Sequence, residues 1–371
     1  MKVLVTGGAG FVGSHIVDSL VKLGYEVRIY DNLCPQVHGD IDKPPAYLNP
    51  EAEFIKADMR DKDRLSQALK GVDIIFHEAA VVGVGQSMYE IRRYVENNVH
   101  GTANLLDIVV NHKNKIQKII VASSMSIYGE GAYRCRQCGV VCPGLRSHEQ
   151  LLNRDWEQRC PKCGISVEPI PTNEDKTIFP TSVYSITKRD QEDLCLTVCR
   201  AYRIPCVALR YFNIYGPRQS VSNPYTGVLA IFLSRLKNNK SLVIFEDGLQ
   251  TRDFIHVSDV VKANMLSLRD EANYEIFNVG TGKAASLLEI IALLTEAFNI
   301  EIEPRPANKY RQGDIRHCFA DISKIQGKLG FKPSLELKEG IKDLCGWAES
   351  QVADDRLKRA LSELDGKGLI I

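Results

Sequence analysis

A glycine-rich turn near the N-terminus restricts the folds that this chain can adopt. Residues 7–13 read Gly-Gly-Ala-Gly-Phe-Val-Gly, with Gly7, Gly10 and Gly13 three residues apart. A β-rich run, KVLVTG, comes before the turn, and apolar residues at helical spacing follow it at 13–23. Such a backbone can approach a pyrophosphate, which the amides of a helix N-terminus stabilise. The pattern predicts a dinucleotide-binding strand–turn–helix unit, with an ordinary turn as the alternative.

Strand-like and helix-like patterns alternate through the first 130 residues. Further strands are expected at 25–31, 52–58, 73–80 and 118–124, with helices between them at 62–70 and 95–112. This alternation is typical of a parallel sheet with helices on both faces. We therefore expect an α/β fold with a Rossmann-type, doubly wound parallel sheet.

The pattern changes at about Tyr133 and again near residue 210. We expect a dinucleotide-binding domain formed by 1–132 and 171–209, interrupted by an insert at 133–170. A smaller α/β substrate domain is expected at 210–350, and a helical tail at 351–371.

The composition is that of an average soluble protein. Of 371 residues, 44% are hydrophobic and 25% are charged, and the net charge is +1. This charge creates no general attraction for nucleic acid or anionic lipid. No apolar run reaches the roughly 18 residues that a membrane span needs, and glycines interrupt the apolar start. We expect a cytoplasmic protein without a membrane or nucleic-acid partner.

Asp31 strengthens the dinucleotide interpretation. It ends the second expected strand, 18 residues after Gly13. A carboxylate there accepts hydrogen bonds from ribose hydroxyls and repels the additional phosphate of NADP, so NAD is favoured. Asp58 ends the third strand, where it could reach an adenine or could instead cap a helix or turn.

Three further residues suggest catalysis. Tyr184 and Lys188 are spaced i, i+4, which places them on one helix face. A nearby ammonium lowers the pKa of a tyrosine, which can then act as a general base. Ser124, at a strand end, could hydrogen-bond the same substrate oxygen, or could simply cap that strand.

Taken together, several motifs identify a family resemblance. They are TGGAGFVG at 6–13, HEAA at 77–80, NNV at 97–99, the serines and Tyr-Gly of 123–129, Tyr184-x-x-x-Lys188, LRYFNIYGPRQ at 209–219 and RDFIHV at 252–257. The chain resembles the extended short-chain dehydrogenases/reductases, in their NAD-dependent nucleotide-sugar epimerase/dehydratase branch.

The resemblance implies a set of binding residues, bound NAD, a nucleoside diphosphate sugar substrate and a homodimer formed through a helix pair. The expected NAD contacts are Gly7, Gly10, Phe11, Val12, Gly13, Asp31, Asn32, Asp58, Met59, Ala79, Ala80, Asn98, Tyr184 and Lys188. The expected substrate contacts are Ser124, Asn213, Arg218, Arg252, Arg311 and Asp314. Gln312 stands where the family usually has proline, and each arginine could instead form a surface ion pair.

The residues after Ser124 separate the possible reactions. Family members that remove water from the sugar carry an Asp-Glu pair there, and the decarboxylases keep the Glu. This chain has Met125 and Ser126, which cannot protonate a leaving hydroxyl at neutral pH. A 4-epimerase acting through a transient 4-keto sugar is therefore favoured. A dehydratase, decarboxylase or reductase remains an alternative, and a non-catalytic NAD-binding scaffold a more remote one.

Four of the eleven cysteines form two Cys-x-x-Cys pairs, Cys135/Cys138 and Cys160/Cys163, with 21 residues between the pairs. Four thiolates suit tetrahedral structural zinc and leave no open position for catalysis. A zinc ribbon is predicted, with a disulfide pair or redox switch as alternatives, and Cys142 as a spare thiol. Most of the remaining cysteines are expected to be small buried residues.

The insert falls between Ser124 and Tyr184, so we expect it near the sugar pocket or a subunit interface. It resembles that of a subset of bacterial enzymes of the dTDP-L-rhamnose 4-epimerase type, as does the 245–253 stretch. The hypothesis is that zinc holds a wall or lid of the active site. Ribbons also bind nucleic acid, but acidic residues (Glu149, Asp155, Glu157) offset the arginines (Arg134, Arg136, Arg146, Arg159).

Overall fold

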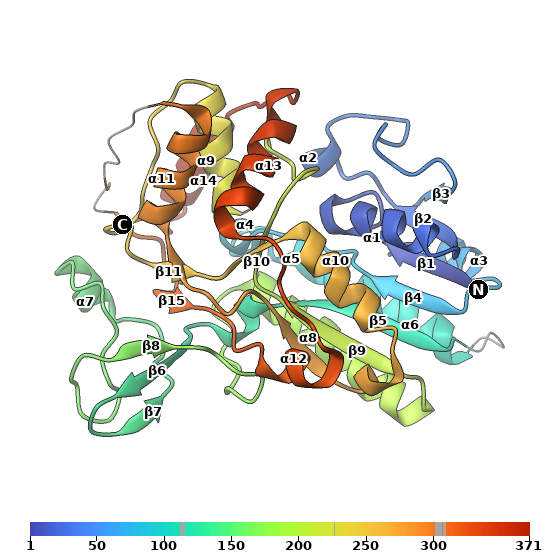
Figure 1. The fold of residues 1–371 in the computed structure, drawn as a ribbon, viewed down its shortest axis with the longest axis horizontal. Coiled ribbons are helices and arrows are strands. Elements are labelled where there is room, and N and C mark those ends of the chain that lie inside the picture. The colour runs from blue at the N-terminus through green and yellow to red at the C-terminus, as the bar shows by residue number, and fades with distance from the viewer. Residues whose placement is uncertain (112–115, 226, 301–305, 307–308) are drawn as a thin grey trace.

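A seven-stranded parallel sheet forms the centre of the computed structural model, which describes residues 1–111, 116–225, 227–300, 306 and 309–371 (Figure 1). The strand order is β13-β9-β5-β4-β1-β2-β3, and every neighbouring pair is parallel. The strands are β1 (Lys2–Thr6), β2 (Glu26–Asp31), β3 (Glu53–Lys56), β4 (Ile74–His77), β5 (Lys118–Ser124), β9 (Cys206–Tyr211) and β13 (Ile276–Val279). The first five confirm the strands expected from the sequence.

Helices cover both faces of this sheet. One face is covered by α1 (Phe11–Lys22), α10 (Val257–Leu266) and α12 (Ser323–Leu329), and the other by α3 (Lys62–Ala68), α6 (Gly101–Asn111) and α8 (Val183–Tyr202). Strand β1 shows how the sequence produces this arrangement: Val3 and Val5 enter the first core, whereas Leu4 enters the second. An apolar run is thus needed where both faces are buried. The doubly wound prediction is confirmed; the last residue of the helix expected at 95–112 lies outside the described residues.

A second unit packs beside the sheet. Its core lies between α9 (Val228–Lys237), α11 (Leu287–Phe298) and α13 (Leu337–Glu349). Two small sheets support it, made of β10 (Asn213–Tyr215) with β12 (Phe254–His256), and of β14 (Ala285–Ser286), β11 (Thr251–Arg252) and β15 (His317–Cys318). The range 210–350 nevertheless serves both units, because it also supplies β13, α10 and α12 to the central sheet and its faces.

The insert forms a small projection at one end of the molecule (Figure 1). It contains an antiparallel sheet of β6 (Ala132–Cys135), β7 (Gly139–Val141) and β8 (Glu168–Ile170), together with α7 (His148–Leu152). Its own core is only five buried residues, two of them cysteines: Tyr133, Cys135, Val141, Cys160 and Val167. A core this small leaves the segment dependent on other contacts.

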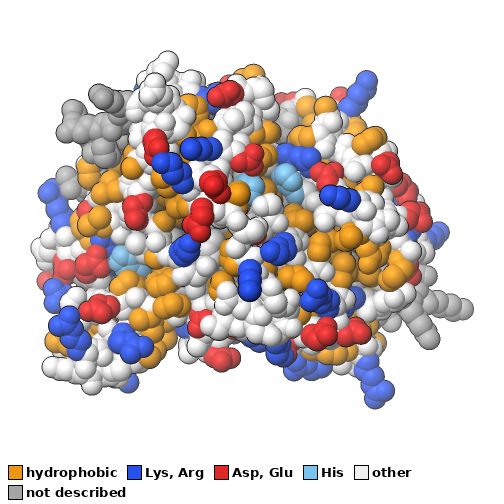
Figure 2. Space-filling view, in the orientation of Figure 1, with side chains coloured by type: hydrophobic (Ala, Val, Ile, Leu, Met, Phe, Trp, Pro, Cys, Tyr) orange, Lys and Arg blue, Asp and Glu red, His pale blue; other side chains and the backbone are white. Residues whose placement is uncertain are grey.

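Short elements complete the chain. They are α2 (Pro35–His38), α4 (Val84–Ser87), α5 (Ile91–Tyr94), the π-helix η1 (Val95–His100), the 3₁₀ helices η2 (Met125–Tyr128) and η3 (Asp270–Ala272), and α14 (Leu357–Asp365) in the tail. In the described part of the chain, no helix is both long and apolar enough to cross a bilayer. Basic and acidic side chains are interspersed on the face shown in Figure 2.

Candidate active site

The glycine turn joins β1 to α1 at the carboxyl edge of the sheet. Gly7 has φ +68°, and a Cβ on it would lie 2.8 Å from Ala79 N. A Cβ on Gly13 would lie 2.3 Å from Gly7 O, well inside van der Waals contact. These positions therefore require glycine, and they bring the loop beside Ala79 and Ala80, which follow β4. Phe11 and Val12 begin α1, where free amides point toward the turn.

Asp31 lies against the same turn. Its Oδ2 accepts from Ala9 N at 3.0 Å and its Oδ1 from Leu33 N at 2.9 Å. Burial raises the pKa of this carboxyl, and the backbone bonds oppose that shift. Each carboxylate oxygen can accept a second hydrogen bond, so the group remains able to receive a ribose hydroxyl.

The expected adenine-side residues form a polar cluster after β3. Asp58 accepts from Asn32 Nδ2 at 3.0 Å and from Arg60 Nε at 2.8 Å. Burial raises the pKa of Asp58, but the bonds from Arg60 and Asn32 outweigh it and lower the value to about 2. Asp58 also accepts from Arg60 N, so the turn interpretation of this residue holds as well. Met59 is buried beside Gly101.

Asn98 links the cofactor side to the catalytic helix. Its Oδ1 accepts from Val81 N at 2.7 Å, and its Nδ2 donates to Thr187 Oγ1 at 3.0 Å. It belongs to the π-helix η1, a local distortion often found at functional sites. The amide therefore fixes the segment after β4 relative to α8.

Ser124 and Tyr184 meet where β5 ends and α8 begins. Ser182 caps α8 by accepting from Ser185 N at 3.1 Å, so Tyr184 occupies the first turn. Tyr184 N donates to Ser87 Oγ at 3.0 Å, which ties this turn to α4. Burial raises the pKa of the Tyr184 phenol to about 12, and a hydrogen bond with Ser124 opposes the rise.

Lys188 follows one turn later and is buried. Its Nζ donates to Gln191 Oε1 at 2.8 Å. Burial lowers the pKa of Lys188, while the buried carboxylate of Glu78 raises it. The expected lowering of the tyrosine pKa by Lys188 is thus not seen in the protein alone, because burial dominates at Tyr184 and the ammonium is bound to Gln191.

The residues after Ser124 carry no acid. Met125 is buried, and Ser126 Oγ donates to Ser124 Oγ at 2.9 Å. Ser124 also accepts from Ser126 N at 3.2 Å, so it caps η2 in addition to facing Tyr184.

Three of the expected diphosphate-binding residues lie together. Arg252 donates to Ile315 O at 2.7 Å and to Arg316 O at 2.9 Å. Arg311 Nε donates to Asp314 Oδ2 at 2.9 Å, four residues at most from those carbonyls. The segment 311–316 therefore carries Arg311 and Asp314 and also orients Arg252. Planar guanidinium groups suit the paired oxygens of a diphosphate.

The two remaining substrate candidates differ. Asn213 Oδ1 is buried and has no hydrogen-bond partner among the residues that the structure describes, as expected of a group that meets a ligand. Arg218 is placed elsewhere: it contacts Asp18 Oδ2 at 2.7 Å and lies over the ring of Tyr47, whose hydroxyl donates to Ala9 O. Its positive φ of 69° turns it toward the glycine loop.

The C-terminal tail crosses the mouth of this site. Residues 369–371 form a β-bridge with the 310–312 segment, with Gln312 N donating to Leu369 O at 3.0 Å. Glu363 of α14 accepts from Tyr89 and Tyr225 at 3.0 and 2.7 Å. A cavity of about 10 Å³ remains between Gly85, Ser182, Arg311 and Leu364. The tail thus covers the gap between the two units.

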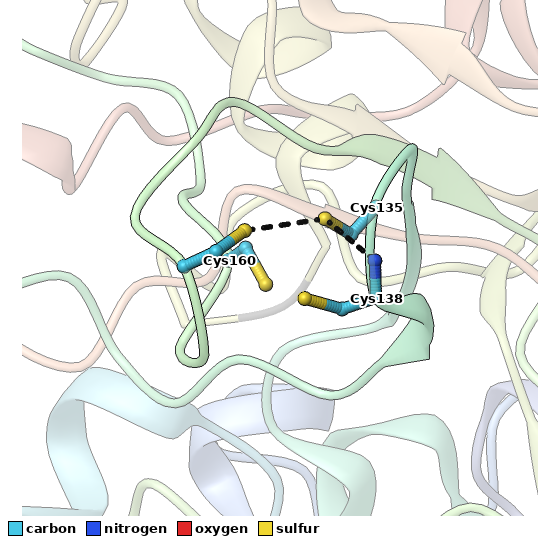
Figure 3. A group of neighbouring side chains, drawn as sticks. Cys135, Cys138 and Cys160 are labelled. Atoms are coloured by element: carbon cyan, nitrogen blue, oxygen red, sulfur yellow. Dashed lines mark hydrogen bonds between the residues drawn. The ribbon is translucent and has the colours of Figure 1, made fainter.

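The four cysteines of the insert converge (Figure 3). Their sulfur atoms all lie within 4.8 Å of one another, and Cys135 Sγ and Cys163 Sγ are 3.5 Å apart. A disulfide would need about 2.05 Å, whereas sulfurs sharing tetrahedral zinc at about 2.3 Å lie close to the observed separation. Gly139 and Gly164, one after each pair, have φ +74° and +76°, as the tight turns require. The residues fit zinc. Of the other cysteines, five are buried and Cys142 is exposed.

Sequence reasoning did not assign roles to three of these side chains. Glu78 belongs to a recognised motif, but only the fold shows that it is buried opposite Lys188. Ser87 and Gln191 bind the first turns of α8 and carry no motif of their own. Their only signal would have been the helix periodicity that places Gln191 on the same face as Lys188.

Comparison with known proteins agrees with this geometry. Residues 3–140 and 163–280 match the NAD dependent epimerase/dehydratase family, and most of the insert falls in the gap. A dTDP-L-rhamnose 4-epimerase of Burkholderia thailandensis is 36% identical over 355 residues, covering 95% of this chain and 96% of that protein.

Solved structures are also similar. The UDP-glucose 4-epimerase of Thermotoga maritima, with UDP-glucose, superposes with TM-score 0.76 at 31% identity, covering 94% of this chain and 99% of that one. The UDP-glucuronic acid 4-epimerase of Bacillus cereus, with UDP-glucuronic acid and NAD, gives TM-score 0.75 at 30% identity and the same coverages. By sequence match and by structure, this chain belongs to the NAD dependent epimerase/dehydratase family.

Proposed function

We propose that the protein is an NAD-dependent nucleotide-sugar 4-epimerase that acts through a transient 4-keto sugar. The observation that carries the proposal is the meeting of Ser124 with Tyr184, one turn before Lys188, at a site where Met125 and Ser126 provide no acid for elimination. A scaffold without catalysis would not need this trio.

In this reaction Tyr184 takes the proton of the C4 hydroxyl, and later returns it to the same oxygen. Ser124 hydrogen-bonds that oxygen and holds it beside the phenol. Lys188 supplies a fixed positive charge that favours the phenolate. NAD, when bound, accepts the C4 hydride and gives it back to the opposite face of the ring. Met125 offers an apolar wall against which the keto sugar can turn.

Asn213, Arg252, Arg311 and Asp314 would hold the nucleoside diphosphate. The buried Asn213 amide and the grouping of the other three around 311–316 support this assignment. The relative in Burkholderia thailandensis makes dTDP-L-rhamnose the first sugar to test.

NAD rather than NADP is proposed as the cofactor. Asp31 would receive the ribose hydroxyls, and a 2′-phosphate would meet its negative charge. The narrow approach of Gly7, Gly13 and Ala79 would admit the pyrophosphate, and Asn32, Asp58, Met59 and Asn98 would line the rest of the groove.

We also propose that the four insert cysteines hold one structural zinc ion. Their converging sulfurs and the five-residue core of the insert support it. Metal binding would supply the stability that this core lacks.

A homodimer is proposed through the surface of α5, η1 and α8. Large apolar side chains are exposed there, with Ile91 at 53%, Val95 at 43% and Ile186 at 47% exposure. Burial against a second copy would remove them from water. An Ile186→Asp variant should sediment as a monomer if this surface is the interface.

Deuterium at C4 of the substrate tests the reaction path. The epimerised sugar should keep its deuterium at C4, because the hydride leaves and returns within one active site. Uptake of solvent hydrogen at C5 or C6 would instead indicate elimination and would contradict the proposal.

A further inference from the structure

The insert contacts one end of the 310–316 segment through aromatic side chains. Trp156 packs edge-on against Tyr310 with ring centroids 6.3 Å apart, and Leu151 is buried with them. The Tyr310 hydroxyl bonds His148 Nδ1 at 2.8 Å. Tyr310 directly precedes Arg311, so this cluster fixes the chain where the expected diphosphate-binding side chain begins.

The other end of the segment is held by buried charges. Arg316 is fully buried, and its guanidinium contacts Glu157 of the insert at 2.6 Å and Glu246 at 2.9 Å. Asp247 lies 2.6 Å from the same group. These carboxylates offset the cost of burying the arginine, and removing one partner would leave a charge unpaired.

Arg146 joins the insert to this network. Its guanidinium donates twice to Glu246, at 2.9 and 2.6 Å, and once to Asp314 O at 3.3 Å. Its side chain is only 1% exposed. It therefore serves no surface role in nucleic-acid binding; it positions both Glu246 and the backbone of Asp314.

The backbone of the segment is held as well. Glu130, which leads into β6, accepts from Arg316 N and His317 N at 2.8 Å each. Gln158 of the insert donates to the same carboxylate at 2.9 Å. The insert thus contacts the segment at Tyr310, at Asp314 and at Arg316.

We propose that the four-cysteine insert is a positioning element for the diphosphate site. It fixes both ends of the segment that carries Arg311 and Asp314 and that orients Arg252, and it thereby sets the affinity for a nucleoside diphosphate. This rests on the proposed nucleotide-sugar substrate. The chemical trio Ser124, Tyr184 and Lys188 lies outside these contacts, so affinity should change without a matching change in turnover.

The cysteines explain why a metal would matter here. Trp156, Glu157 and Gln158 come shortly before Cys160, and Arg146 lies in the loop between the two cysteine pairs. A metal that joins the pairs would fix this loop and the side chains that reach the 310–316 segment.

Arg146→Gln in the full-length protein tests the proposal, with Arg159→Gln as the control. Arg159 lies in the same insert but pairs with Asp155 at an exposed position. Calorimetry would measure the Kd of dTDP, UDP, GDP and CDP, alongside bound NAD, zinc content, KM and kcat. Arg146→Gln should weaken binding of the preferred nucleotide about tenfold and raise KM, with bound NAD unchanged and kcat within about twofold. Arg159→Gln should behave like the wild type.

A second variant protects the test against misfolding. Glu157→Gln weakens the Arg316 contact from a half-exposed position and should raise the Kd about threefold to tenfold. Cys160→Ser should lower zinc content and affinity together. An unchanged Kd in Arg146→Gln and Glu157→Gln, or an equal loss of NAD, kcat and affinity, would overturn the proposal.

Failure of the proposed function is separately visible. Wild-type protein that binds a nucleoside diphosphate but epimerises no sugar would contradict that function, while the Kd values would still decide the role of the insert. Wild-type protein that binds none of the four nucleotides would overturn both.

Discussion

Lys188 Nζ donates to Gln191 Oε1 across 2.8 Å, and both side chains are buried. Gln191 Nε2 donates to Thr102 Oγ1 at 2.9 Å, which fixes its amide with the oxygen toward the lysine. Burial lowers the pKa of His77 to about 3, so the neighbouring ring adds no second positive charge. The lysine charge therefore depends on Gln191 and on the Glu78 carboxylate.

Replacing Glu78 by Gln should shift the pH dependence of the reaction. The carboxylate raises the pKa of Lys188, so its removal should lower that pKa. Lys188 would then lose its proton at a lower pH, and the alkaline limb of kcat/KM should move to lower pH. Steady-state rates from pH 6 to 10 would measure the shift.

The surroundings of Lys188 make this test specific. The other facing groups are Glu192, which is paired with Arg210, and Cys195, together with Tyr211, whose hydroxyl bonds Glu78. Glu53→Gln, an exposed change at the far sheet edge, is the control and should leave the profile unchanged. An alkaline limb of Glu78→Gln that coincides with the wild type would contradict the role of Glu78.

Tyr184→Phe should lower kcat by about 10²- to 10⁴-fold, the range typical of a lost general acid–base group. Bound NAD should remain, because the ring and its packing against Tyr94 are kept. Tyr202→Phe, at the exposed end of the same helix, should keep full activity. Loss of activity equal in both variants would show that the effect is not chemical.

Gly13→Ala should abolish NAD retention and lower the free energy of unfolding by about 2 kcal/mol, because its Cβ would overlap Gly7 O. Gly327→Ala is the matched helical control. No atom lies within 4 Å of its Cβ position, and alanine there should raise stability by about 0.5–1 kcal/mol. Absorbance of the purified proteins would give the bound cofactor, and denaturant titration the stability. Retained NAD in Gly13→Ala would contradict the assignment of the loop.

Glu363→Ala should loosen the tail, because its carboxylate holds both Tyr89 and Tyr225. Freed residues 357–371 should be cleaved faster by protease, and KM should rise, since the tail pairs with the 310–312 segment. Lys358→Ala, exposed on the same helix, serves as the control. Equal cleavage rates for the two variants would show that Glu363 does not hold the tail.

Local patterns were sufficient for much of the fold. The strands of the first half and the start of α8 follow from apolar runs and from the capping serine at 182, which act over a few residues. The glycine turn, the Cys-x-x-Cys knuckles and the absence of acids after Ser124 were equally readable. Each depends on neighbours in sequence.

Contacts between distant residues were not readable. β13 joins β9 although about 65 residues separate the strands, and Arg146 meets Glu246 across 100 residues. Arg218 points toward the glycine loop because of a positive φ that no arginine is expected to adopt. The raised pKa of Tyr184 follows from burial, which periodicity alone does not measure.

The most direct test is product analysis without added cofactor. Purified protein would be incubated with dTDP-L-rhamnose, UDP-glucose, UDP-glucuronate and a GDP-sugar, and the products identified by NMR. The account predicts a sugar inverted at C4, with no net NADH and with NAD still bound. A keto, dehydrated or decarboxylated product, or release of NADH, would contradict it.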